Sequence, residues 1–169
     1  MRIGRAAATT LFLVTLAATA QGVPRQGERF PRVTAEDLTG QVHSTDELVG
    51  RKAFVVALTD RSAVNAARLW YLAADAQIPA NIARQSLVSL RLPFFITTPF
   101  AQGKAREQVP QQYWQATLLD RGAMAKALGL EAGKVPYVFV LDETGRIVAA
   151  VHANVDSPEA QEIWNAFQR

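Results

Sequence analysis

The chain has 169 residues, of which 49% are hydrophobic and 20% are charged, and its formal net charge is +3. This length and balance fit one globular domain with a stable core, and the composition has no bias toward disorder. The sequence contains no cysteine, which excludes disulfides, thiolate metal sites and cysteine nucleophiles. Lysine and arginine are not gathered into any run, so the pattern of a nucleic-acid-binding domain is missing.

Residues 1–20 have the pattern of a secretory signal peptide. Arg2 and Arg5 precede an apolar run over residues 6–20 that has no acidic residue and ends in Ala-Thr-Ala. We expect cleavage after Ala20 and export to the periplasm; the alternative is an uncleaved N-terminal anchor. Removing two of the 18 basic residues leaves 16 against 15 acidic ones, so the mature chain is nearly neutral. No cysteine follows the apolar run, so we expect no lipid attachment of the bacterial lipoprotein type.

The rest of the chain predicts one domain over residues 32–169 after a polar lead-in at 21–31. Ser44 and Glu47 form a capping box for a short helical turn, and Ala53–Leu58 is apolar throughout, as in a strand buried on both faces. Alternating strands and helices indicate an α/β fold with a mixed central sheet flanked by helices. We further expect a hairpin at 32–43, helical segments at 62–77, 80–90 and 123–128, strands at 92–97, 116–119, 137–141 and 146–151, a loop at 99–112 with a short helix at 104–108, and a last helix opening at Ser157.

Two groups of motifs, in a characteristic order, cover most of residues 30–168. Together they resemble the peroxiredoxin and extracytoplasmic thioredoxin-like families, and this resemblance implies a single thioredoxin-like domain. It also implies that Pro136 is a cis-proline beside the start of the active-site helix; the alternative is a trans proline that begins a strand. The motifs are Asp120–Leu130, Lys134–Asp142 and Gly145–Val148 in the C-terminal half, and Phe30–Pro31, Asp37–Gly40 and Glu47–Lys52 in the opening hairpin.

The chain departs from these families at the reactive position. In the families it resembles, a cysteine stands at the N-terminus of the helix that follows the strand matching residues 54–58. Here the corresponding loop, Thr59–Asn65, reads Thr-Asp-Arg-Ser-Ala-Val-Asn. A C-x-x-C register puts Ser62 and Asn65 at the two cysteine positions, and a T-x-x-C register puts Thr59 on the threonine and Ser62 on the cysteine. Both registers therefore place Ser62 where the reactive cysteine would be.

Ser62 has two interpretations. As a nucleophile it needs an adjacent base, and His152 after the last strand is the candidate, although no G-x-S-x-G elbow supports the pair. As a structural residue, Ser62, Asp60 or Thr59 caps the helix by accepting hydrogen bonds from its free amides. We adopt the second interpretation. The other histidine, His43, is expected to be a solvated hairpin residue.

No cofactor or metal site is expected. The two histidines stand far apart in the sequence and give no metal-ligand spacing, and the glycines follow no phosphate-binding pattern. Several aromatic residues flank the segment 98–112, and most of them belong in the core. Phe100 and Trp114 are the two that we expect to be partly exposed, and a place at a recognition rim is the alternative to an ordinary position at the edge of the core.

Two main functions compete. In the first, the protein is an exported non-redox module that binds a peptide, a protein partner or a small ligand at the former active-site groove, because strand-like pairing beside the proline requires no thiol. In the second, the scaffold is an enzyme that uses Ser62 with a base such as His152. A third alternative is a redox-pathway protein that relies on a partner's cysteine. We adopt the first, without nucleic-acid binding or stable membrane insertion after cleavage. Its expected groove residues are Thr59, Asp60, Arg61, Ser62, Asn65, Val135 and Pro136.

Overall fold

The computed structural model describes residues 22–168, so the expected signal peptide lies outside the described residues. Within this range seven strands form one mixed sheet, in the order β2-β1-β5-β4-β3-β6-β7. None of the helices in this range is long and apolar enough to cross a lipid bilayer. The elements are β1 Thr34–Asp37, β2 Val42–Ser44, β3 Ala53–Leu58, α1 Val64–Gln77, β4 Ala83–Ser89, α2 Thr98–Arg106, β5 Thr117–Asp120, α3 Ala123–Ala127, β6 Tyr137–Leu141, β7 Ile147–His152 and α4 Ala160–Phe167.

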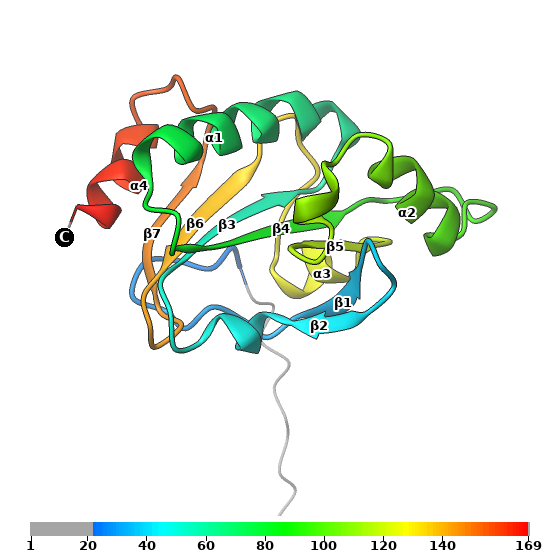
Figure 1. Cartoon of the computed structure of the whole chain (residues 1–169), viewed down its shortest axis with the longest axis horizontal. Helices are drawn as coiled ribbons and strands as arrows, with labels where there is room; N and C mark the ends of the chain where they lie inside the picture. The colour runs from blue at the N-terminus through cyan, green and yellow to red at the C-terminus, as the bar shows by residue number, and fades with distance from the viewer. Residues whose placement is uncertain (1–21, 169) are drawn as a thin grey trace, which may run out of the picture.

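Helices cover both faces of this sheet (Figure 1). The three central strands β3, β4 and β5 run parallel, and the other neighbouring pairs are antiparallel. α1 and α4 cover one face over β3, β6 and β7, while α3 lies on the opposite face and α2 lies beside β5. This arrangement confirms the expected α/β fold with a mixed central sheet.

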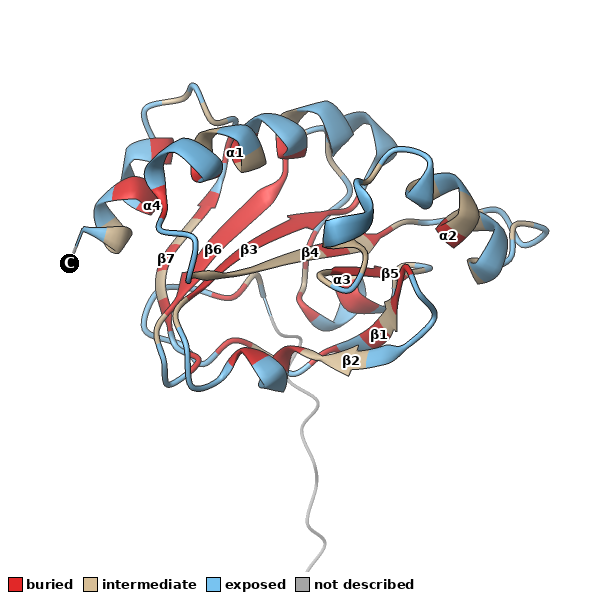
Figure 2. Ribbon diagram, viewed as in Figure 1, coloured by how far each residue is buried: buried red, intermediate tan, exposed pale blue. Residues whose placement is uncertain are grey.

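The strand β3 divides the core into two halves. All six of its residues are buried, as its unbroken apolar sequence predicts (Figure 2). Because side chains alternate along a strand, Val55 faces the core under α3, and Phe54 and Val56 face the core under α1 and α4. On that second side the Phe54 ring is stacked against Trp164, with ring centroids 6.4 Å apart. β3 is therefore packed against buried side chains on both of its faces.

Three expectations between β3 and β5 are wrong. Residues 80–90 were expected to be helical, but Ala83–Ser89 is strand β4, which is paired with β3 on one side and β5 on the other. This pairing outweighs the helix-like polar pattern, since a strand's stability comes from its neighbours more than from its own propensity. The expected strand at 92–97 is instead a turn in which the Ile96 amide donates to the Pro93 carbonyl oxygen at 3.0 Å. The expected loop that follows contains the full helix α2, which begins after Thr97, whose hydroxyl accepts from the Phe100 amide.

His43 is not the solvated residue that the sequence suggested. Its two ring nitrogens lie 2.9 Å from a Glu47 carboxylate oxygen and 3.1 Å from an Asp37 carboxylate oxygen. The Asp37 side chain is fully buried, so this ring bridges a buried and an exposed carboxylate. The hydrogen bond with Glu47 is the main cause that raises the pKa of His43 above its ordinary value. The contact ties the β1–β2 hairpin to the short helical turn after it.

Candidate functional site

The turn between β3 and α1 is capped by an aspartate. Asp60 accepts hydrogen bonds at one carboxylate oxygen from the Ser62 amide at 2.8 Å and from the Ser62 hydroxyl at 2.6 Å. The first of these bonds satisfies the amide of the second residue of the helical segment, which begins as a short 3-10 turn at Arg61–Ala63. The two Ser62 donors hold the pKa of Asp60 below its ordinary value. Of the three candidate caps, the structure therefore selects Asp60.

Thr59 has a different role at the same turn. It is buried, and its hydroxyl donates to the Glu131 carbonyl oxygen at 2.8 Å and accepts from the Gly133 amide at 3.2 Å. These bonds join the end of β3 to the segment that leads into Val135 and Pro136. The Thr59 side chain thus fixes the end of β3 relative to the segment that precedes Pro136.

The pairing of Ser62 with His152 is wrong. The Ser62 hydroxyl points its hydrogen at the Asp60 carboxylate, as described above. The His152 ring is stacked on Tyr137, with ring centroids 3.8 Å apart and planes 7° apart, and its Nε2 lies 3.1 Å from the Val135 carbonyl oxygen. Asp60, with its lowered pKa, is a poor general base at neutral pH. The corner therefore holds a capped helix start rather than an activated nucleophile.

Pro136 also differs from what the resemblance implies. No cis peptide bond occurs among residues 22–168, so the Val135–Pro136 bond is trans. Pro136 is buried and immediately precedes β6, a position where a missing amide breaks no ladder hydrogen bond. This is the alternative in which proline simply begins the strand.

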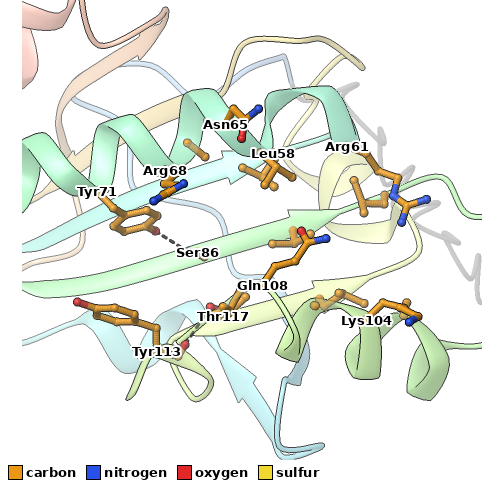
Figure 3. Close-up of a pocket in the computed structure, with 18 of the residues that line it drawn as sticks. Leu58, Arg61, Asn65, Arg68, Tyr71, Ser86, Lys104, Gln108, Tyr113 and Thr117 are labelled. Carbon is orange, nitrogen blue, oxygen red and sulfur yellow. Dashed lines mark hydrogen bonds between the residues drawn. The ribbon is translucent and has the colours of Figure 1, made fainter. Parts of the chain in front are cut away.

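A large cavity lies beside this corner, between α1 and α2 (Figure 3). Its volume is about 1070 Å³, and its floor is the part of the sheet formed by β4 and β5. α1 packs on β3 and α2 packs on β5, so β4 between them is left partly uncovered on this face. Ser86 and Val88 of β4 are accordingly only half-buried. The cavity results from this spacing of the two helices.

The cavity includes only part of the expected groove. Arg61 and Asn65 line it, whereas the other expected groove residues do not: Thr59, Asp60, Ser62, Val135 and Pro136. Phe100 also lines the cavity and is 55% exposed, so the expected partial exposure is confirmed. Trp114, the second expected rim residue, is half-buried outside the lining and donates its indole N–H to the Val109 carbonyl oxygen at 2.8 Å.

Sequence reasoning missed most of the cavity wall. Leu72 and Phe95 line it and are 55% and 68% exposed, and the adjacent Phe94 is 91% exposed. For Leu72 the sequence does carry a signal, because Val64 and Leu72 are about two helical turns apart and form an apolar stripe on the outer side of α1. The phenylalanines gave no such signal, because the segment 92–97 reads equally well as a buried strand.

Among residues 22–168, no group of three or more histidine, cysteine, aspartate or glutamate side chains is placed to hold a metal ion. The lining of the cavity includes four basic residues and a single acidic one. These are Arg61, Arg68, Arg84, Lys104 and Asp75.

Comparison with known proteins gives the fold. No family model matches the sequence, and no curated protein matches it. A thiol peroxidase from Chromobacterium violaceum superposes with a TM-score of 0.62 at 16% identity, covering 88% of this chain and 90% of that one. An exposed lipoprotein thioredoxin from Streptococcus pneumoniae gives 0.57 at 12% identity, with 80% and 98% covered. The thioredoxin domain of a thiol-disulfide oxidoreductase from Bacteroides vulgatus gives 0.57 at 14%, with 85% and 95% covered.

These likenesses define the class: the chain has a thioredoxin-like fold, as the motifs predicted. It is a cysteine-less example of that fold. At sequence identities of 12–16%, these structural likenesses show the fold and nothing more. The thiol chemistry named for those proteins therefore has no counterpart in this chain's own side chains.

Proposed function

We propose that the protein is an exported, non-redox binding protein that holds a ligand with an apolar surface in the cavity between α1 and α2. The observation that carries the proposal is the cavity itself, about 1070 Å³ in volume and walled by exposed apolar side chains. Pockets of roughly 300–1,000 Å³ with mostly apolar walls are typical of small-molecule sites. Exposed apolar surface of this kind is stabilised when a ligand covers it.

The position of the cavity supports binding at the former active-site face. Its wall begins at Arg61, in the turn where thioredoxin-like enzymes carry their reactive group, and continues at Asn65 in the first turn of α1. The other side of that turn, toward Val135 and Pro136, is closed by the Thr59 hydrogen bonds. A ligand at this face is therefore proposed to extend from the turn along α1, away from the proline.

Capping, rather than catalysis, accounts for the polar groups of the turn. Ser62 is engaged by Asp60, and the one histidine near the corner is engaged by Tyr137 and Val135. We therefore expect the purified protein to give no insulin reduction and no peroxide turnover above a heat-inactivated control. Neither Ser62 nor Asn65 can cycle through a disulfide or a sulfenate. Turnover above that control would contradict a non-redox role.

Export is the second part of the proposal. It is supported by the basic start, the apolar run and the Ala-Thr-Ala ending of residues 1–20. Mass spectrometry of the protein recovered from the periplasm should find a chain that begins at Gln21. Recovery of the chain with Met1 intact would contradict cleavage.

Binding can be tested with an uncharged apolar fluorescent probe such as N-phenyl-1-naphthylamine. Ala105 of α2 lines the cavity, so Ala105→Trp should fill part of it and weaken probe binding by about tenfold or more. Ala127→Trp, at an exposed position on α3 outside the lining, is the matched control and should leave binding unchanged. Equal loss in both variants, or no probe binding by the unaltered protein, would contradict the proposal.

A further inference from the structure

We propose that the ligand of this cavity is the free anion of an aliphatic carboxylic acid of about ten carbons or more, with its carboxylate at the arginines of the α1 wall and its aliphatic tail along the floor. This inference rests on the proposed function, since it names the ligand of the same cavity. Three observations support it. The polar groups of the floor are already hydrogen-bonded, the walls are long and apolar, and, among the residues that the structure describes, unpaired positive charges lie at the rim.

The floor offers no free strand edge to an extended peptide. β4 is hydrogen-bonded to β3 on one side and to β5 on the other, so its backbone polar groups are already used in the sheet. A peptide bound in extended form would find no ladder to join and would leave its own amides and carbonyls unpaired against apolar walls. An aliphatic chain has no such groups to satisfy.

The polar side chains of the floor are engaged as well. The Tyr71 hydroxyl lies 2.6 Å from the Ser86 hydroxyl and donates to the Gln85 carbonyl oxygen at 3.1 Å. The Thr117 hydroxyl donates to the Tyr113 carbonyl oxygen at 2.9 Å. Burial raises the pKa of Tyr71, so this hydroxyl stays neutral at physiological pH. The surface that remains between these pairs is apolar, with Val88 and Leu119 on the same face of the sheet.

The walls make the cavity long and apolar. Its α1 side runs from Arg61 to Asp75, which is roughly 20 Å at the rise of an α-helix. Leu72 stands on this wall, with Phe95 and Phe100 on the facing side, and all three are more than half exposed. A single aliphatic chain laid along this direction would cover them together, and burial of that surface favours binding in proportion to its area.

The charges at the rim favour an anionic head group. Of the lining residues with charge, Asp75 is paired with Arg84, and Lys104 is paired with Glu107 at 2.9 Å. In the part of the chain that the structure describes, Arg61 and Arg68 have no carboxylate within ion-pair distance. Figure 3 shows Arg61 at the same end of the cavity as Lys104, and Arg68 farther along α1.

A guanidinium group matches a carboxylate well, because its planar N–H donors can bond both oxygens at once. Arg61 in the 3-10 turn and Arg68 on α1 both line the cavity, so they face the same space. The volume, about 1070 Å³, lies just above the range of roughly 300–1,000 Å³ for pockets that hold one small molecule, so we assign a free monomeric acid rather than a membrane surface.

The test compares decanoate with decanol by displacement of the bound fluorescent probe. Decanoate should bind more tightly than decanol at low salt, and added salt should weaken decanoate binding only. Arg61→Gln and Arg68→Gln should each weaken decanoate binding by about threefold to tenfold and leave decanol binding unchanged. Arg51→Gln, at an exposed arginine outside the cavity, is the matched control and should have no effect. Longer acids should bind up to about fourfold more tightly per added methylene until the cavity is filled.

The outcomes separate this inference from the function on which it rests. If decanoate and decanol bind equally, or if neither arginine substitution changes decanoate binding, the proposal of a carboxylate ligand is overturned. The proposed function, binding of an apolar ligand in the cavity, would still hold. Binding to anionic vesicles without binding of soluble decanoate overturns the free acid. If neither the probe nor decanoate binds the folded protein, both proposals fail. Circular dichroism of each variant shows whether it is folded, and Arg68→Lys should keep part of the decanoate affinity because it keeps the charge.

Discussion

Trp70 donates its indole N–H to the backbone carbonyl oxygen of Ala153 at 2.9 Å. The donor lies in the middle of α1 and the acceptor follows the last residue of β7, so the bond joins elements far apart in the chain. The Trp70 ring is fully buried, and its centroid lies 5.2 Å from that of Trp164 on α4. This bond fixes α1, and with it one wall of the cavity, to the sheet face that α1 and α4 share.

We expect Trp70→Phe to destabilise the protein by about 1–3 kcal/mol, because it leaves the Ala153 carbonyl oxygen buried without a donor. The smaller ring adds to this effect by leaving a void. Urea unfolding followed by circular dichroism measures the change in free energy of unfolding. Leu69→Ala, at the exposed neighbouring position, is the control and should change it by less than about 0.5 kcal/mol. A loss of unfolding free energy in Trp70→Phe that is no larger than the loss in Leu69→Ala would contradict a stabilising role of the indole hydrogen bond.

Thr59→Val keeps the shape of the side chain and removes both of its hydrogen bonds. We expect a loss of about 1–3 kcal/mol in the free energy of unfolding, because the Glu131 carbonyl oxygen and the Gly133 amide lose their partner. Amide hydrogen exchange at Gly133 should become faster in the native state. Thr59→Ser, which keeps the hydroxyl, should retain most of the protection at Gly133. Unchanged exchange in Thr59→Val would contradict the bridging role.

The double change Ser62→Cys and Asn65→Cys tests the alignment of the active-site turn. These exposed positions lie three residues apart at the start of the helical segment, where a disulfide is geometrically possible. We expect an intramolecular disulfide without loss of fold, and a pKa of the Cys at position 62 below the free value of about 8.5.

Thiol titration and mass spectrometry would detect this disulfide. Ser62→Cys with Leu69→Cys is the control, since those positions are about 10 Å apart along a helix. Only intermolecular dimers in the first pair would contradict the alignment.

His43 predicts a pH dependence of stability. Its pKa is raised, chiefly by the hydrogen bond with Glu47, above an ordinary value of 6.5. Protonation therefore stabilises the folded state fully below pH 6.5, and this contribution is lost as the pH rises through the folded pKa. The pKa of Glu47 is lowered, chiefly by its hydrogen bond from the Ser44 amide, so it stays ionised near pH 5.5 and the pair is intact there.

His43→Gln should accordingly destabilise the protein more at about pH 5.5 than at about pH 8.5. Chemical denaturation at the two pH values measures the difference, and an NMR titration of the His43 ring gives its pKa directly. An equal effect at both pH values, or a ring pKa below the ordinary one, would contradict the ion pairs with Asp37 and Glu47.

The sequence predicted the central strand and the C-terminal hairpin well because their signals are local. Ala53–Leu58 is unbroken apolar sequence, and the turn after Leu141 carries Asp142, whose carboxylate accepts from the Thr144 and Arg146 amides at 2.8 and 3.0 Å. β4 could not be predicted in the same way. Its Arg84-Gln85-Ser86 stretch has no apolar run or strict alternation, and it is a strand because β3 and β5 stand on either side of it.

The candidate site was predicted only where it coincides with the turn. The motif order located Asp60 and Ser62 at the start of the helix, and a cap there is an ordinary local feature. The cavity depends instead on the distance between α1 and α2 and on a strand left partly uncovered, which no spacing of residues in the sequence expresses. The hydrogen-bond and stacking partners of Ser62 and His152 could not be predicted from the sequence either, because they depend on the side-chain directions in the folded chain.

The position of β1 in the sheet constrains the order in which the protein can fold. β1 and β2 form a hairpin early in the chain, but β1 completes its pairing with β5, Glu36 opposite Leu119. A two-stranded hairpin alone is marginal in water, and contacts between distant segments form slowly because the intervening chain must first be closed into a loop. Until Thr117–Asp120 is available, the N-terminal hairpin has no sheet to join. A chain interrupted before β5 would leave both the hairpin and the open side of β4 as unpaired edges, which are the sites where unfolded chains associate with one another.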